Sequence, residues 1–256
     1  MTKIYAIISG KGGVGKSTTA VNLGMSLNKL GEDVIIVDGN LTTPNIGIHL
    51  GAPIVPITFN HVLNNQARIE DAIYEHESGT KIIPASLSLK EVERIDYRKI
   101  PDIFKKLKKL TNYVLIDSAA GLGDEARFSM ISADEIIIVT NAEMTAVTDA
   151  LKTIKLAEEY NKPVKGIILT RYEGKRTEMS LSNIKDMLEA PFLGIVPEDD
   201  AIKESQIYKN AVVYTSPRSV AARSYIETAR RLLGEDIPVC DPYSGFSRFW
   251  RIILRK

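Results

Sequence analysis

The strongest constraint on the fold is a glycine-rich octapeptide near the start of the chain. It follows the mostly apolar run 3–9 and precedes residues 17–30, whose apolar side chains have helical spacing. In this context of strand, loop and helix, the pattern G-x-x-x-x-G-K-[S/T] binds phosphate, because glycines let backbone N–H groups turn towards phosphate oxygens and the helix start adds its positive dipole end. The octapeptide consists of Gly10, Lys11, Gly12, Gly13, Val14, Gly15, Lys16 and Ser17.

The last two residues of the octapeptide separate it from a similar pattern. Lys16 can reach the β- and γ-phosphates of a nucleotide, and the Ser17 hydroxyl can ligate Mg²⁺. Three of the glycines also spell G-x-G-x-x-G, and Asp38 ends the next expected strand, where dinucleotide-binding enzymes keep the acid that binds ribose. A dehydrogenase is therefore an alternative. A lysine and a serine directly after the third glycine favour the phosphate loop.

Near-continuous apolar runs recur along the chain. Residues 34–37, 113–116, 135–140, 164–169 and 192–196 join residues 3–9 as expected strands. Apolar strands of this kind are buried on both faces, which is typical of a parallel sheet covered by helices. Expected helices follow at residues 99–110, 124–131, 145–160, 182–188 and 221–233. We therefore expect an α/β fold with a doubly wound, mostly parallel sheet and helices on both faces.

The loop and several later segments together resemble one family. Residues 11–18, Lys-Gly-Gly-Val-Gly-Lys-Ser-Thr, are similar to the deviant Walker A motif of the MinD and ParA ATPases. Residues 37–40 lie where that family has switch I, residues 113–121 resemble its Walker B motif and switch II, and residues 139–143 resemble a segment near its nucleotide. The resemblance continues at residues 193–199 and 219–233, covers nearly the whole chain and is closest to the MinD branch.

The resemblance implies an ATPase domain over residues 1–235 that binds ATP or ADP with Mg²⁺. It implies that Lys11 crosses an ATP-bridged homodimer to the partner's phosphates, although by itself this lysine fits a solvated turn equally well. Lys16 would hold the phosphates of its own nucleotide. Ser17 would ligate Mg²⁺, and Asp38 and Asp117 would bind the ion or its waters. The implied nucleotide contacts further include Thr18 and Glu143, and near the base Thr170, Arg171, Pro197, Glu198 and Asp199.

Three positions depart from the family pattern. Asn40 replaces the second aspartate of Asp-x-Asp, which in the family lies near the attacking water. A carboxamide can orient water but is a poor proton acceptor, so we expect slow hydrolysis. Thr170 replaces an asparagine, which puts side-chain recognition of the purine in doubt, and Ala119 replaces a proline in switch II.

Residues 246–256 have the pattern of a membrane-surface helix. On a helix the bulky apolar residues share one face and the arginines lie opposite. This arrangement favours an amphipathic helix in the headgroups of an anionic leaflet, as in the MinD branch, over a docked helix that completes the core. Residues 236–245 contain two prolines and are expected to form a linker. The membrane-facing residues would be Phe246, Phe249, Trp250, Ile253 and Leu254, with Arg248, Arg251 and Arg255 facing the lipid headgroups.

Charge and composition exclude several classes. The chain has 33 Lys and Arg against 32 Asp and Glu, so a broad nucleic-acid surface is not expected, and the lysine-rich stretch 104–110 has the spacing of a solvated helix. No apolar run approaches the roughly 20 residues that cross a bilayer. One cysteine, Cys240, and three histidines without ligand spacing predict neither a disulfide nor a multi-cysteine metal site.

Together these features predict a MinD-like ATPase switch. We expect a cytoplasmic protein, peripheral on the inner face of the cell membrane, whose partners are a second copy, an anionic membrane and an unidentified regulator or cargo. Its purpose would be the positioning of a division site or a polar machine. The alternatives are a DNA-partitioning ATPase like ParA, a metal-cluster carrier, which one cysteine cannot support, and a scaffold that binds ATP without hydrolysing it.

Overall fold

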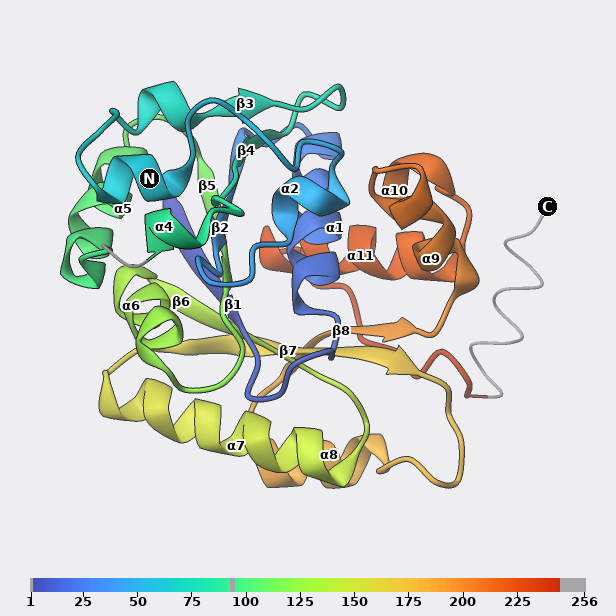
Figure 1. Cartoon of the computed structure of the whole chain (residues 1–256). Coiled ribbons are helices and arrows are strands. Elements are labelled where there is room, and N and C mark those ends of the chain that lie inside the picture. Colours follow the sequence, from blue (N-terminus) through green and yellow to red (C-terminus); the bar gives the residue numbers. More distant parts are fainter. Residues whose placement is uncertain (1, 93–94, 245–256) are drawn as a thin grey trace.

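A central sheet organises the molecule (Figure 1). The computed structural model describes residues 2–92 and 95–244. The eight strands across the sheet follow the order β3-β4-β2-β5-β1-β6-β7-β8, and neighbours are parallel except the pair β3 and β4. The expected doubly wound, mostly parallel sheet is confirmed. The strands are β1 (Lys3–Ile8), β2 (Val34–Gly39), β3 (Tyr74–Glu75), β4 (Lys81–Ile83), β5 (Tyr113–Ser118), β6 (Glu135–Thr140), β7 (Val164–Tyr172) and β8 (Phe192–Pro197).

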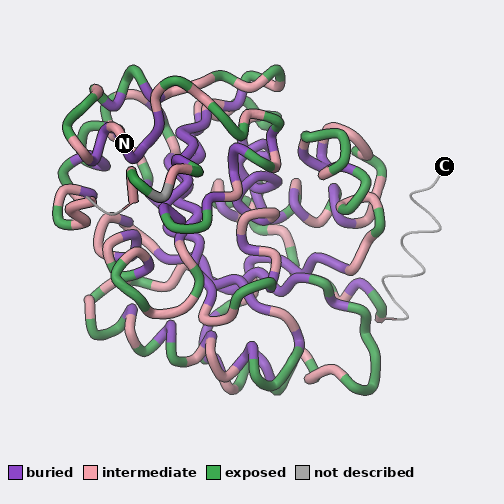
Figure 2. The backbone as a smooth tube through the Cα atoms, in the orientation of Figure 1, coloured by how far each residue is buried: buried purple, intermediate pink, exposed green. Residues whose placement is uncertain are grey.

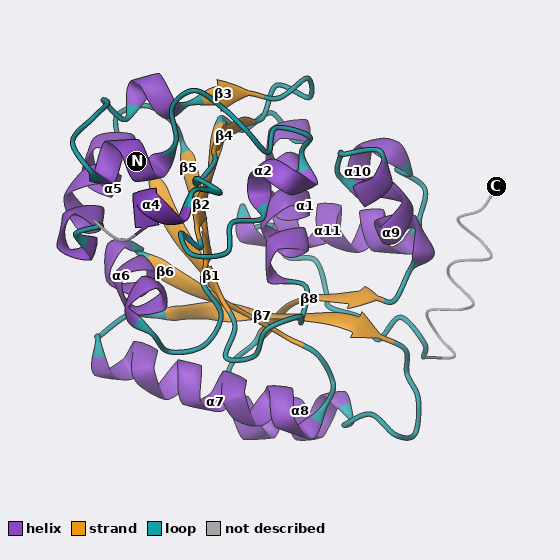
Figure 3. Ribbon diagram, in the orientation of Figure 1, coloured by secondary structure: helices purple, strands orange, loops and turns teal. Residues whose placement is uncertain are grey.

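Helices cover both faces of this sheet (Figure 3). Helix α1, which follows the phosphate loop, and helix α11, near the end of the domain, lie on one face. Helices α5 to α8 lie on the other. The helices are α1 (Lys16–Lys29), α2 (Ile46–His49), α3 (Phe59–Leu63), α4 (Leu89–Val92), α5 (Ile100–Leu107), α6 (Asp124–Ser132), α7 (Met144–Glu159), α8 (Leu181–Leu188), α9 (Asp200–Ile207), α10 (Val212–Thr215) and α11 (Val220–Leu232), with 3₁₀ turns at Glu70–Ala72 and Tyr97–Lys99.

The sheet separates two hydrophobic cores, and its strands are the most continuously buried part of the chain (Figure 2). Phe104 of α5 and Ile154 of α7 pack in the first core, and Leu23 of α1 and Tyr225 of α11 pack in the second. Alternate residues of each strand point to opposite cores. This explains why the strands read as apolar runs without alternation.

The strand register brings together the residues that follow three central strands. Asp38 at the end of β2 pairs in register with Asp117 of β5, and Asp117 pairs with Ile7 of β1. Parallel strands end at one edge of a sheet, so the loops after β1, β2 and β5 meet there. A Cβ atom at Gly10 would lie 2.3 Å from the backbone oxygen of Asp149 in α7, which is why this first loop must begin with glycine.

The segment expected to be a linker lies against the domain. Residues 236–244 form no helix or strand, as expected, but Arg231 of α11 donates to the carbonyl oxygens of Ile237 (2.8 Å) and Pro238 (2.9 Å). The ring of Tyr243 packs edge-on against Tyr172, with ring centroids 5.7 Å apart. The interfacial helix predicted for residues 246–256 lies outside the described residues. In the ranges that the structure covers, no helix is long and apolar enough to cross a membrane.

Candidate nucleotide-binding site

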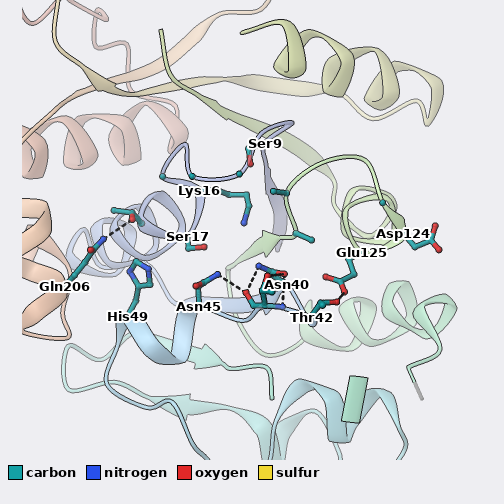
Figure 4. Close-up of a pocket in the computed structure, with 18 of the residues that line it drawn as sticks. Ser9, Lys16, Ser17, Asn40, Thr42, Asn45, His49, Asp124, Glu125 and Gln206 are labelled. Atoms are coloured by element: carbon teal, nitrogen blue, oxygen red, sulfur yellow. Dashed lines mark hydrogen bonds between the residues drawn. The ribbon is translucent and has the colours of Figure 1, made fainter. Parts of the chain in front are cut away.

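A cavity of about 760 Å³ opens where the loops after β1, β2 and β5 meet (Figure 4). This is the edge at which open parallel sheets bind ligands. Lys16 points into the middle of the cavity, His49 and Gln206 lie on one wall, and Thr42 and Glu125 lie on the other. Further lining residues are Ser9, Gly12, Gly13, Gly15, Ser17, Thr18, Asn40 and Ala119.

The glycine loop supplies the cavity with backbone donors. Gly15 has φ 89°, in the left-handed region that favours glycine, and it precedes the first turn of α1. No side chain among residues 2–92 and 95–244 caps this helix start. The N–H groups of the first turn and the positive end of the helix dipole are therefore available to an anion at the loop.

Lys16 and Asp117 form a buried ion pair beside the loop. Lys16 Nζ donates to Asp117 Oδ1 at 2.5 Å, and both side chains are almost entirely buried. The second carboxylate oxygen of Asp117, Oδ2, is also buried and has no hydrogen-bond partner in the described part of the chain. A buried carboxylate oxygen without a donor fits a cation or its hydration water. With the Ser17 hydroxyl on the cavity wall, this is a donor set suited to Mg²⁺.

Asp38 holds the loop that follows β2. Its Oδ2 accepts from the backbone N–H groups of Asn45 (2.8 Å) and Ile46 (2.9 Å), and its Oδ1 accepts from that of Asn40 (3.2 Å). Burial, and secondly the charge of Asp117, raise the pKa of Asp38 to about 7. The carboxylate therefore fixes residues 40–46 against the cavity and stands directly beside the Lys16–Asp117 pair.

The carboxamide of Asn40 is turned into its own loop. Its Nδ2 donates to the carbonyl oxygen of Thr43 at 2.6 Å, and its Oδ1 accepts from Thr43 Oγ1 at 3.0 Å and from Thr43 N at 3.3 Å. The side chain is buried in this arrangement. An amide suits the site because it offers a donor and an acceptor to one residue, which a carboxylate cannot do.

Lys11 projects from the loop to an acidic partner. Its Nζ lies 2.7 Å from Glu143 Oε2 and 3.3 Å from Thr145 Oγ1, and both members of the ion pair are exposed. A hydrogen bond from Lys11, together with its charge, lowers the pKa of Glu143. Asn141 donates to the other carboxylate oxygen of Glu143 at 3.1 Å. Glu143 precedes α7, so this helix holds the Lys11 side chain at the rim of the site.

Comparisons with known proteins agree with this geometry. The sequence profile of an AAA domain matches residues 2–165. The septum site-determining protein MinD of Synechocystis is 32% identical in an alignment that covers 100% of this chain and 98% of that protein. The chain belongs to the MinD/ParA family of P-loop ATPases. An ATP-binding protein of Methanocaldococcus jannaschii is 36% identical over 91% of this chain and 89% of its own length. The structure of MinD from Pyrococcus horikoshii complexed with Mg-ADP superposes with a TM-score of 0.87 at 35% identity, covering 93% of this chain and 100% of that one.

Residues that the MinD/ParA resemblance assigns to the base lie beside the main cavity. Thr170 and Arg171 are near the end of β7, and Pro197 ends β8. A second cavity of about 70 Å³ is lined by Thr170, Arg171, Glu198 and Asp199, together with Gly15 and Thr18 of the loop and α1. The structure thus gathers the predicted phosphate and base residues on one side of the molecule. The residues predicted for the membrane, Phe246 to Arg255, lie outside the described ranges.

Other side chains of the cavity were not predicted. Burial lowers the pKa of His49, which ends α2 on the cavity wall. Gln206 of α9 donates to Thr18 Oγ1 at 3.3 Å, and the carboxylate of Glu125 accepts from the hydroxyl groups of Thr42 and Tyr97. None belongs to a motif of the MinD/ParA family that the sequence displays. These residues come from separate segments that the fold brings together, so their spacing in the sequence did not indicate that they line the site.

Proposed function

We propose that this chain is an ATP-dependent switch that binds Mg-ATP, joins a second copy through the bound nucleotide and attaches reversibly to an anionic membrane surface. One observation carries the proposal: an uncapped helix start and the Lys16–Asp117 pair lie at the phosphate loop, while Lys11 stands exposed at the rim. The relatives named MinD favour spatial positioning, such as that of a division site, as the purpose.

The described residues suggest which groups would bind the phosphates and which would bind Mg²⁺. Backbone N–H groups of residues 10–17 and the Lys16 ammonium would bind the phosphates. Ser17 and Asp117 Oδ2, which has no hydrogen-bond partner among the described residues, would hold Mg²⁺ directly or through water, with Asp38 ordering the adjoining loop. Bound Mg²⁺ supplies charge neutralisation at the phosphate oxygens.

Lys11 is suited to the contact between two copies. It lies on the exposed side of the loop and its only partners among the described residues, Glu143 and Thr145, are surface groups. An exposed ion pair of this kind is readily exchanged for another anion because water and salt screen it. Lys11 would leave Glu143 and reach the phosphates held by the second copy.

The membrane step rests on the amphipathic pattern of residues 246–256. We propose an ATPase domain at residues 1–235, a connecting segment at 236–245 and a membrane-targeting helix at 246–256. One short amphipathic segment binds a bilayer weakly, whereas two segments on one dimer bind at a raised effective concentration, which strengthens attachment by about 10² to 10⁴. The bound nucleotide would thereby control whether the protein is on the membrane, and an unidentified regulator or cargo would bind the protein there.

A slow or absent hydrolysis step is part of the proposal. The Asn40 amide is engaged with Thr43, and a carboxamide is a poor proton acceptor. This observation also favours a second candidate, a scaffold that uses ATP only to join two copies. Measured phosphate release distinguishes the scaffold from the ATPase.

Sedimentation of the full chain with phosphatidylglycerol vesicles tests the function. With Mg-ATP we expect dimers by light scattering and at least tenfold more vesicle-bound protein than with Mg-ADP. Vesicle binding that is equal in the two nucleotides would contradict the switch. Retention on DNA-cellulose without vesicle binding would favour a ParA-like partitioning ATPase.

A further inference from the structure

One wall of the main cavity holds a carboxylate to which the proposed function assigns no role. Glu125 stands in the first turn of α6, which begins directly after the loop that follows β5. It lines the cavity together with Asn40 and Thr42 of the loop that follows β2. Its side chain lies beside Thr42, across the cavity from His49 and Gln206 (Figure 4). The two loops after β2 and β5 thus build this wall between them.

The two oxygens of the Glu125 carboxylate have different surroundings. Oε1 accepts from the hydroxyl group of Thr42, and from that of Tyr97 at 3.2 Å. Burial, and secondly the charge of Glu125, raise the pKa of Tyr97 to about 12, so this hydroxyl keeps its proton and remains a donor. Oε2 is buried and has no hydrogen-bond partner among the described residues. Because a buried acceptor without a donor is costly, Oε2 is suited to accept from a molecule in the cavity.

The terminal phosphate of a bound nucleotide would lie towards this wall. Lys16 points into the middle of the cavity, where the phosphates would follow the glycine loop. Arg171, which the MinD/ParA resemblance assigns to the base, lines the smaller cavity together with Gln206, so the base end of the site is on the Gln206 side. A nucleotide extends in one line from its base to its last phosphate. That phosphate is therefore directed away from Gln206 and towards Thr42 and Glu125.

The other polar groups near this wall are engaged or directed elsewhere. The oxygens of Asp38 accept from three backbone N–H groups, and Asp117 forms the buried ion pair beside the loop. The amide of Asn40 is bonded within its own turn and is a poor proton acceptor. Asp124 is exposed and directed away from the middle of the cavity (Figure 4). Among the described residues of this wall, Glu125 supplies the carboxylate oxygen that can still accept a proton.

We propose that Glu125 is a catalytic residue of this switch, and that its Oε2 orients the attacking water and accepts the proton of that water during ATP hydrolysis. The water oxygen forms a bond to the γ-phosphorus while the bond from this phosphorus to the bridging oxygen breaks, and the electron pair of the broken bond stays on ADP. The proton passes to the Glu125 carboxylate and from there to solvent. The inference rests on the ATP-dependent function proposed above and favours the ATPase over the scaffold.

Phosphate release by the full chain at saturating Mg-ATP tests the proposal. Glu125→Gln keeps the size of the side chain and can still accept a hydrogen bond, but it cannot take up the proton. We expect at least a tenfold lower kcat, with KM and the dissociation constant for Mg-ADP within threefold of the unaltered chain. ATP-dependent dimers should last longer, so more protein should stay on phosphatidylglycerol vesicles after ATP is diluted. Asp124→Asn removes the same charge from the neighbouring position and should leave kcat within threefold.

The contrary outcomes are distinct. An unchanged kcat in Glu125→Gln, an equal loss in Asp124→Asn, or a loss of Mg-ADP affinity that matches the loss of kcat would overturn the proposal. An unaltered chain that forms dimers with Mg-ATP but releases no phosphate would overturn it as well, in favour of the scaffold. Each of these results leaves the nucleotide-dependent switch intact. Failure of the unaltered chain to bind Mg-ADP, or to form dimers with Mg-ATP, would instead contradict the proposed function and this proposal with it.

Discussion

Lys16 Nζ and Asp117 Oδ1 lie 2.5 Å apart in the protein interior, although 101 residues separate the two in the chain. Taking two charges out of water is costly, so the pair persists because each partner neutralises the other. The loop lysine is thereby held in position by β5, which pairs with β1 in the sheet but lies far from α1 in the order of elements along the chain. Folding of the central sheet and organisation of the phosphate site are consequently the same event.

Removing Lys16 should therefore impair both binding and stability. Lys16→Ala leaves the Asp117 carboxylate buried without its partner, which destabilises proteins by about 3–5 kcal/mol. We expect loss of ATP binding by calorimetry and a lower free energy of unfolding in urea. The double variant Lys16→Ala with Asp117→Ala is the control, and it should recover stability but not binding. Normal ATP affinity in Lys16→Ala would refute the assigned role.

Lys11 should affect assembly without affecting the fold. Its partner Glu143 is exposed, so the pair contributes little to stability. Lys11→Ala should keep appreciable ATP binding and lose ATP-dependent dimers in light scattering. Glu143→Gln removes the charge that holds Lys11 and should favour dimers at lower protein concentration. Normal dimerisation of Lys11→Ala with ATP would show that this lysine does not contact a second copy.

His49 should make the nucleotide-free protein sensitive to acid. Burial lowers the pKa of His49 from its ordinary value of 6.5; the Asp117 charge opposes this, and Lys209 and Lys16 add to it. Below pH 6.5 the unfolded chain binds a proton that the folded chain resists, so stability falls as the pH decreases from that value. Substitution by glutamine should reduce this loss, measured as the difference in urea unfolding between the two proteins at pH 7.5 and pH 5.5. An unchanged pH dependence would show that His49 titrates alike in both states.

The sequence predicted the central strands well because strands that are buried on both faces consist mostly of apolar residues. In the run 135–140, the four central residues 136–139 are Ile, Ile, Ile and Val, and β6 has the bounds of that run. Between β2 and β5 only the helix at 99–110 was predicted, and it is found as α5; α2, α3 and α4 were missed because they are four or five residues long, and β4 because it has three. Elements this short have little periodicity and form only through tertiary contacts, such as Phe59 against Phe104.

The site was predictable where residues are adjacent and unpredictable where they are not. Residues 10–18 form one continuous loop and helix start, so their sequence pattern is sufficient to predict the phosphate-binding loop. The partners of Lys11 and Thr170 lie on distant segments, and those of Asn40 depend on how the loop after β2 folds. The Asn40–Thr43 bonds in particular show an amide suited to closing a turn, a structural reason for asparagine that a catalytic motif does not reveal.

Cutting the chain after Ser244 should separate folding from membrane attachment. Residues 236–244 would remain, with their contacts to Arg231 and Tyr172. We expect an unchanged thermal midpoint and ATP affinity, and loss of sedimentation with anionic vesicles. A second cut after Glu235 is the matched control, and it should lower the midpoint because Tyr172 is uncovered and Arg231 loses the carbonyl acceptors of Ile237 and Pro238. Unfolding caused by the first cut would instead favour a terminal helix docked on the core.

The substitution Asn40→Asp should change both the stability of the turn after β2 and the lifetime of the ATP-bound state. An aspartate can still accept from Thr43 N and Oγ1, but it loses the bond that Asn40 Nδ2 donates and places a negative oxygen beside the Thr43 carbonyl. An unsatisfied buried acceptor costs about 1–3 kcal/mol, so the variant should be less stable than the unaltered chain and its loop should open more readily. A carboxylate near the attacking water should at the same time speed phosphate release by about 10²-fold or more, which corresponds to about 2.7 kcal/mol of barrier.

Vesicle residence should shorten together with this faster release, because both depend on how long ATP joins two copies. The comparison requires saturating ATP and Mg²⁺, so that differences in affinity do not appear as differences in turnover. Asn40→Ala is the matched control: it also loses the bond to Thr43 but gains no carboxylate, so it should be destabilised without faster release. Equal turnover of Asn40→Asp and the unaltered chain would show that this position closes the turn and takes no part in hydrolysis. The scaffold would then lose the observation that favours it.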